Sequence, residues 1–115
     1  MKELRTVLAS AEFMEFYTSL SPKIQEKYDY VIQMIKSTKV VNTRFVKKLE
    51  QTEFYELRVS VSTNEYRTVI LTIDSRSFVE STQVLLLNSF LKKGTKQYKA
   101  EVEKARGILN KEEGK

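Results

Sequence analysis

The sequence contains no cysteine and no histidine among its 115 residues. Without cysteine the chain can form no disulfide, thiolate zinc site, iron–sulfur cluster or thiol nucleophile, and this absence fits a reducing compartment. Without histidine it has no Ser-His-Asp triad, no HExxH metal site and no imidazole base. Any reaction here therefore has to use Lys, Arg, Tyr, Asp or Glu, and we expect neither a metal nor another cofactor.

Glycine and proline are also scarce, with 3 and 1 residues, which argues against a disordered or low-complexity chain. No apolar run approaches the roughly 20 residues that a membrane span needs, and the charged first residues lack a signal-peptide core. We expect a cytoplasmic protein without a membrane segment. The length predicts a single domain over residues 1–115, with a core at about 4–109 and a charged tail at 110–115.

Basic residues outnumber acidic ones by 20 to 15, and the pI is about 9.4, which favours polyanionic partners. The excess lies in the C-terminal part of the chain. No acidic residue occurs between Glu80 and Glu101, whereas this interval holds a group of lysines: Lys92, Lys93, Lys96 and Lys99.

The first half of the chain predicts a strand and a pair of helices. Residues 4–8 suit a short strand, and Ser10 is a candidate cap for a helix whose apolar residues recur at helical spacing. Ser21-Pro22 ends this helix and begins a second one, because proline is favoured at the first helical position. A polar stretch and a short helical turn over 43–49 are expected to follow.

The second half predicts a sheet and a last helix. Apolar residues alternate with polar ones over 55–61, and further strands are expected at 66–73 and 84–87, separated by polar turns. A helix over 96–109 carries one apolar side. This order predicts an α+β domain in which an N-terminal helical hairpin packs on a mainly antiparallel sheet of about four strands, with a C-terminal helix added.

Two arginines are candidates for holding phosphate. Arg58 projects from a strand, where a guanidinium can bind a phosphate through two parallel hydrogen bonds, although a solvated strand residue is the simpler interpretation. Arg67 begins the next strand. In the alternating pattern of this strand, Arg67 falls on the same face as the apolar residues Val69, Leu71 and Ile73. Pairing it with Arg58 on an open face therefore requires a bulge, or a sheet whose two faces are both partly apolar.

The segment after the most buried strand supplies three further candidates. Paired lysines at the end of a strand, such as Lys92 and Lys93, can hold phosphates, and two neighbouring ammonium groups can lower each other's pKa enough to leave a fraction of neutral amine as a base. A solubilising run in a loop is the alternative. Tyr98 can stack on a base or donate a phenolic proton, but its place in the apolar stripe of the last helix also suits core packing.

Taken together, four motifs of the chain resemble the phage-derived Gp49-like, HigB-type branch of the RelE/ParE toxin superfamily. They are FYELR at 54–58, Tyr66-Arg67 with its apolar strand, VLLLNSFLKKGTK at 84–96 and EVEKA at 101–105, so that the resemblance covers about residues 5–106. It implies a toxin of a type II toxin–antitoxin pair, a metal-independent endoribonuclease that cuts mRNA on the ribosome and so inhibits translation.

The resemblance also implies the site and the partners. The basic motif positions of that branch are Arg58, Arg67, Lys92 and Lys93, to which we add Tyr98 as a candidate acid, and we expect further RNA contacts from Lys96, Lys99 and Arg76. The expected partners are the ribosome with its mRNA and a cognate antitoxin, a helix-turn-helix protein through which alone the chain would meet operator DNA. Two alternatives stay open: a non-catalytic nucleic-acid-binding or regulatory module, and a ParE-like toxin that acts on gyrase.

Overall fold

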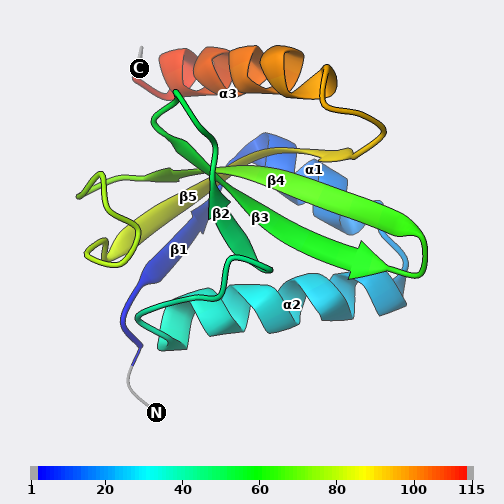
Figure 1. Cartoon of the computed structure of the whole chain (residues 1–115), viewed down its shortest axis with the longest axis horizontal. Helices are drawn as coiled ribbons and strands as arrows, with labels where there is room; N and C mark the ends of the chain where they lie inside the picture. Colours follow the sequence, from blue (N-terminus) through cyan, green and yellow to red (C-terminus); the bar gives the residue numbers. More distant parts are fainter. Residues whose placement is uncertain (1–2, 114–115) are drawn as a thin grey trace.

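The computed structural model describes residues 3–113 and shows the α+β fold that the sequence predicts. A five-stranded sheet lies between two layers of helix (Figure 1). On one face pack α1 (Ala11–Thr18) and α2 (Pro22–Ser37), which form the expected N-terminal hairpin, and on the other lies α3 (Gln97–Glu113). None of the helices in the described range is long and apolar enough to cross a membrane.

The sheet is antiparallel except at one edge. Its order is β1-β5-β4-β3-β2, and only the β1–β5 pair is parallel. The strands are β1 (Thr6–Ala9), β2 (Val46–Lys48), β3 (Phe54–Val61), β4 (Asn64–Thr72) and β5 (Gln83–Leu91).

The short strand β2 takes up residues 46–48, in the second half of the helical turn that the sequence predicted over 43–49. Residues 43–45 do form a turn, but Val46, Lys47 and Lys48 pair with the outer edge of β3. The open backbone groups of β3 explain this outcome, because an edge strand without a neighbour leaves its N–H and C=O groups unpaired.

The ends of the first two helices follow local sequence signals. The Ser10 hydroxyl accepts a hydrogen bond from the Phe13 N–H at 3.0 Å, as predicted for an N-cap, and Pro22 occupies the first turn of α2. Proline suits this place because the first N–H groups of a helix have no partner within it.

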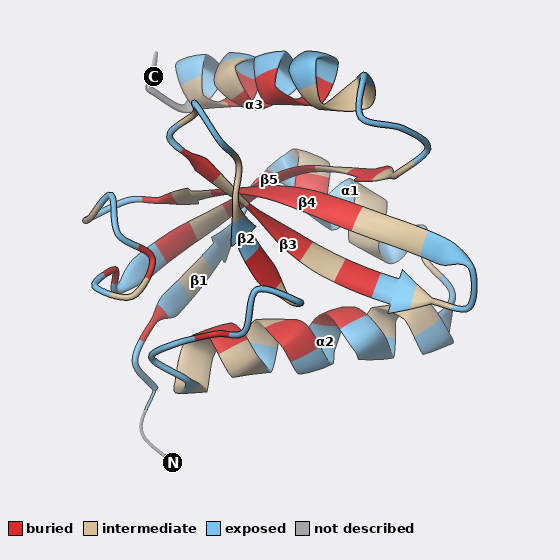
Figure 2. Cartoon of the chain, viewed as in Figure 1, coloured by how far each residue is buried: buried red, intermediate tan, exposed pale blue. Residues whose placement is uncertain are grey.

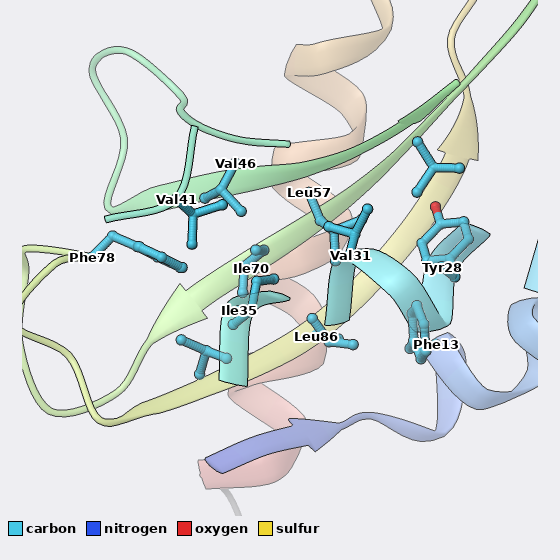
Figure 3. Packing of buried hydrophobic residues seen from close by; sticks show 12 residues of the cluster. Phe13, Tyr28, Val31, Ile35, Val41, Val46, Leu57, Ile70, Phe78 and Leu86 are labelled. Carbon is cyan, nitrogen blue, oxygen red and sulfur yellow. The ribbon is translucent and has the colours of Figure 1, made fainter. Parts of the chain in front are cut away.

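Both faces of the sheet are buried along its middle (Figure 2). On the face of α1 and α2, a first cluster includes Phe13, Tyr28, Ile35, Leu57 and Leu86, which converge between helix and sheet in Figure 3. On the face of α3, a second cluster comprises Phe54, Val69, Leu87, Phe90, Val102, Ala105 and Ile108. A polar side chain of β3 or β4 on the α3 face is therefore also covered in the middle of the sheet.

A β-bulge in β5 sets which side chains face α3. Ile70 pairs with Leu86 and Thr68 with Ser89, so Leu87 and Asn88 both lie opposite the single residue Val69. The amide of Asn88 donates to the backbone and carboxylate oxygens of Glu101 in α3, both at 3.0 Å. Beyond the bulge, β5 runs on past the predicted end at residue 87, and Phe90 lies on the α3 face.

A buried arginine that the sequence analysis did not single out joins β1 to two loops. Arg5 is 2% exposed, and its guanidinium donates to the carbonyl oxygens of Ile35, Thr38, Lys39 and Phe78. It also lies 4.2 Å from the centre of the Phe78 ring. Every one of these acceptors is distant in sequence, so this role of Arg5 is tertiary.

The last helix is longer than predicted. It runs from Gln97 to Glu113, so residues 110–113 of the expected charged tail are helical, and 114–115 lie outside the described residues. The predicted apolar side of the helix is confirmed, with Tyr98, Val102, Ala105 and Leu109 in or against the second cluster.

Candidate functional site

The candidate site lies on the α3 face of the sheet, around the first turn of α3. Arg58 of β3 and Arg67 of β4 are direct cross-strand partners, as the sequence analysis required of a shared site. No bulge between β3 and β4 is needed for this pairing, because both faces of the sheet are apolar. Tyr98 reaches the same region from α3, and Lys92 reaches it from the end of β5.

The carboxylate of Glu56 is the centre of this arrangement. It is 5% exposed, and its Oε1 accepts a hydrogen bond from the Tyr98 hydroxyl at 2.7 Å. The Nε of Arg67 lies 3.4 Å from the same oxygen, and the Nε of Arg58 lies 3.8 Å from Oε2. One buried carboxylate thus contacts a phenol and two guanidinium groups, and we call these four residues the Glu56 cluster.

Sequence reasoning quoted Glu56 within a motif but assigned it no role. The available signal was its place two residues before Arg58 on a strand, since residues i and i+2 share a face. That pattern does not show whether the face is covered. Because α3 packs over it, Glu56 is buried, and a buried carboxylate requires cationic or hydrogen-bonding partners.

Arg67, a candidate for holding phosphate in the sequence analysis, is buried in the structure. It is 2% exposed. Its guanidinium forms an ion pair with Glu65 at 3.2 Å and donates to the Tyr66 carbonyl at 3.0 Å, in addition to its contact with Glu56. Its Nε has no hydrogen-bond partner among the described residues, so charge rather than an aligned hydrogen bond links it to Glu56.

Tyr98 has both of the roles that the sequence left open. Its ring packs edge-on against Phe90 with centroids 5.5 Å apart, and its hydroxyl belongs to the Glu56 cluster. The Nζ of Lys92 lies 5.9 Å from the centre of the ring. Burial, followed by the hydrogen bond to Glu56, raises the pKa of Tyr98 above 10.0, so the phenol keeps its proton at neutral pH.

We expect this raised pKa to make the protein less stable in alkali. The unfolded chain releases the Tyr98 proton at its ordinary pKa of 10.0, whereas the folded chain retains it, so the stability present below pH 10 falls as the pH rises towards the folded pKa. Burial raises the pKa of Tyr28 in the same direction. In urea unfolding at increasing pH, the free energy of unfolding should decline less steeply for Tyr98→Phe than for the unmodified chain. Equal slopes would show that Tyr98 is not the source of this pH dependence.

A cleft of about 710 Å³ opens beside the cluster, between α3 and the β2–β3 connection. Glu56 and Tyr98 both line it, as does Lys99, one of the predicted RNA contacts. Three further cations that the sequence analysis did not single out also line it: Lys47, Lys48 and Arg106. The carboxylates of Glu50 and Glu103 line the cleft as well, and Arg106 is paired with Glu53 and Glu103. The three lysines, Lys47, Lys48 and Lys99, are therefore the cations through which the cleft can attract a polyanion.

The other predicted residues are distributed unevenly. Lys92 is partly buried beside Tyr98, whereas Lys93 and Lys96 are exposed on the connection between β5 and α3. Arg76 lies in the β4–β5 loop, beyond the end of β4 that is far from Arg67. Since Thr72 alone is about 17 Å along the strand from Arg67, the structure does not bring Arg76 to the cluster. Within residues 3–113, no three acidic side chains gather where they could hold a metal ion.

Comparisons with known proteins agree with this geometry. Residues 15–110 match the family described as "Phage derived protein Gp49-like (DUF891)". Among solved structures, an arginine-to-alanine double mutant of E. coli toxin RelE in the free state is similar, with a TM-score of 0.61, 13% sequence identity and coverage of 87% of this chain and 96% of that one. At such identity the likeness establishes the fold. The comparison with curated proteins finds no match.

Proposed function

Because this chain belongs to the phage-derived Gp49-like family and has the fold of the RelE toxin, we propose that it is the toxin of a type II toxin–antitoxin pair and cleaves mRNA on the ribosome. The observation that carries the proposal is the Glu56 cluster, which lies with Lys92 at the edge of the lysine-lined cleft. This arrangement offers proton-transfer groups and cations side by side, as phosphodiester cleavage requires.

The reaction in question is attack of the RNA 2′-hydroxyl on the adjacent phosphorus. A 2′-O–P bond forms and the P–O5′ bond breaks, which leaves a 2′,3′-cyclic phosphate and a 5′-hydroxyl. The site has to remove the 2′-proton, stabilise the extra negative charge of the transition state and protonate the leaving oxygen.

The residues differ in what they offer to this reaction. The Arg58 side chain is 26% exposed and can contact a phosphate oxygen, and Lys92 offers a second cation next to Tyr98. Tyr98, which keeps its proton, is the candidate donor to the leaving oxygen. The Glu56 carboxylate is the group that can accept the 2′-proton. Arg67 is a positioning residue, because it is buried and holds Glu56.

The same inventory explains why the ribosome is needed. A site without imidazole has a poor base at neutral pH, so free RNA should be cut slowly. Holding the message bent, with the 2′-oxygen in line with the leaving oxygen, supplies an orientation effect of several kcal/mol. The ribosome provides this positioning, and the lysines of the cleft and of the β5–α3 connection provide the attraction to RNA.

An antitoxin is the protein partner that this proposal requires. The lysines of the cleft beside Tyr98, together with Lys92, Lys93 and Lys96, present cations to which an acidic segment would bind rapidly and specifically. A partner covering this surface, or displacing α3, would neutralise the site. We expect a small DNA-binding protein that buries at least about 1,000 Å² in the complex.

Induced expression without an antitoxin should arrest translation and produce cuts in mRNA at codons occupied by ribosomes. The purified chain should cut the same RNA far more slowly in the absence of ribosomes. Primer extension on mRNA from the induced cells locates the cuts. The same method, applied to RNA incubated with the purified chain with and without ribosomes, compares the two rates. Equal cutting with and without ribosomes would contradict the mechanism, and a DNA-damage response without mRNA cuts would instead indicate gyrase as the target.

A further inference from the structure

A second cavity, of about 600 Å³, adjoins the Glu56 cluster through Arg58. It lies between α2, the turn before β2 and the last residues of β3, and its lining includes Lys27, Tyr30, Arg44, Phe45 and Arg58. Arg58 takes part in both sites: its Nε lies 3.8 Å from Glu56, and its Nη1 lies 3.4 Å from the Thr43 carbonyl in that turn. The function proposed above makes no use of this cavity.

The charge of the cavity is unbalanced. Three cations line it, namely Lys27, Arg44 and Arg58, and no carboxylate among the described residues does. Within residues 3–113, Lys27 and Arg44 form no ion pair, and only Glu56 pairs with Arg58. Three cations around one cavity attract an anion. The two arginines favour a phosphate, because a guanidinium can donate two parallel hydrogen bonds to two of its oxygens.

The cavity also presents aromatic surface. Tyr30 is 62% exposed, and its ring stands at 69° to that of Phe45, with centroids 6.2 Å apart. The Arg44 guanidinium lies 5.9 Å from the centre of the Phe45 ring. Proteins that bind single-stranded nucleic acid combine cations, which contact the phosphates of the strand, with exposed aromatic rings, on which the bases stack. An acidic protein segment would use the cations but would gain little from the exposed ring.

We propose that this cavity binds a nucleotide of single-stranded RNA that flanks the one at the Glu56 cluster. Lys27, Arg44 and Arg58 hold its phosphate, and its base stacks on Tyr30. The inference rests on the proposed function, since it takes the same RNA as ligand. Arg58 then contacts the strand between the two sites, and the cavity fixes the register of the RNA at the reacting phosphate.

The test is equilibrium binding of a short, fluorescently labelled single-stranded RNA to the full chain, followed by anisotropy at several salt concentrations. Tyr30→Ala should weaken binding at least about fivefold, and Tyr30→Phe should restore it, because stacking needs the ring and not the hydroxyl. Arg44→Ala should weaken binding and also lower the slope of log K against log salt by about 0.7, the value for one phosphate contact with a single strand. Tyr30→Ala should leave that slope unchanged.

Arg76→Ala is the matched control for Arg44→Ala. Arg76 is also an exposed arginine in a turn, but it lies at the far end of β4, so its loss should leave both the affinity and the salt slope nearly unchanged. If Tyr30→Ala and Arg44→Ala bind RNA as tightly as the unmodified chain, or if Arg76→Ala weakens binding equally, the proposal is wrong. Displacement of the RNA by polyglutamate with no dependence on Tyr30 would also overturn it and would indicate a site for an acidic protein segment.

The binding test separates this inference from the proposed function. Tyr30 and Arg44 lie outside the Glu56 cluster, and the measurement contains no ribosome and requires no cleavage. Cleavage on the ribosome together with unchanged RNA affinity of these variants would leave the proposed function in place and remove the second site. Loss of RNA affinity in these variants, in a chain that never cuts mRNA, would support the second site and remove the proposed function.

Discussion

Replacing Arg67 by alanine is expected to lower the free energy of unfolding by about 3–5 kcal/mol, the cost of removing one partner from a buried ion pair. Arg67 is 2% exposed and faces Glu56, which is itself 5% exposed. Without the guanidinium, the carboxylate of Glu56 would stay buried with Tyr98 and the more distant Arg58 as its remaining partners. For a domain whose total stability is of the order of 5–15 kcal/mol, urea unfolding should register this loss clearly.

Arg58→Ala is the matched control, because Arg58 is the direct cross-strand partner of Arg67 and the same type of residue. Its side chain is 26% exposed and lies farther from Glu56, so its removal should cost only about 1 kcal/mol. In a Glu56→Gln background the cost of Arg67→Ala should shrink, since the uncompensated charge is gone. Equal costs for the two arginines would show that Arg67 does not hold Glu56 in place.

Replacing Lys92 by methionine should slow ribosome-dependent cleavage about 100- to 1,000-fold, the usual loss for one donor that stabilises a transition state. Lys92 is the lysine whose ammonium lies beside the Tyr98 ring, next to the Glu56 cluster. Methionine preserves the apolar stem of the side chain, so stability should change by less than about 1 kcal/mol. Single-turnover cleavage of ribosome-bound message measures the effect directly.

Lys93→Met removes the same charge one residue later, where the side chain is exposed, and serves as the control. It should retain cleavage within about tenfold, because a long-range charge effect is screened by salt. Leu86→Ala provides a reference for unfolding, since truncating this buried leucine should cost about 2–5 kcal/mol. Equal losses of cleavage for Lys92→Met and Lys93→Met would mean that total positive charge matters and that the position beside Tyr98 does not.

Local signals in the sequence were sufficient to predict the order and type of most elements. The Ser10 cap, Pro22 at the start of α2 and the alternation over β3 each depend on residues within a few positions of one another. The strand β2 was missed because its three residues carry little periodicity and exist as a strand only through pairing with β3. The bulge at Leu87 and Asn88 has the same origin, since it is defined against Val69 on another strand.

By itself, the sequence determined that Arg58 and Arg67 lie on successive strands, that Lys92 and Tyr98 follow the most buried strand, and that chemistry here proceeds without imidazole or thiol. Only the tertiary structure decided that Arg67 is buried, that Glu56 links it to Tyr98, that Arg76 lies at the other end of the sheet, and that Lys27 and Arg44 meet Arg58 in a second cavity. The physical reason is that alternation assigns a side chain to a face, whereas its burial depends on which distant helix covers that face. Here α3 covers Arg67 and Glu56, and the charge of a site follows from that coverage.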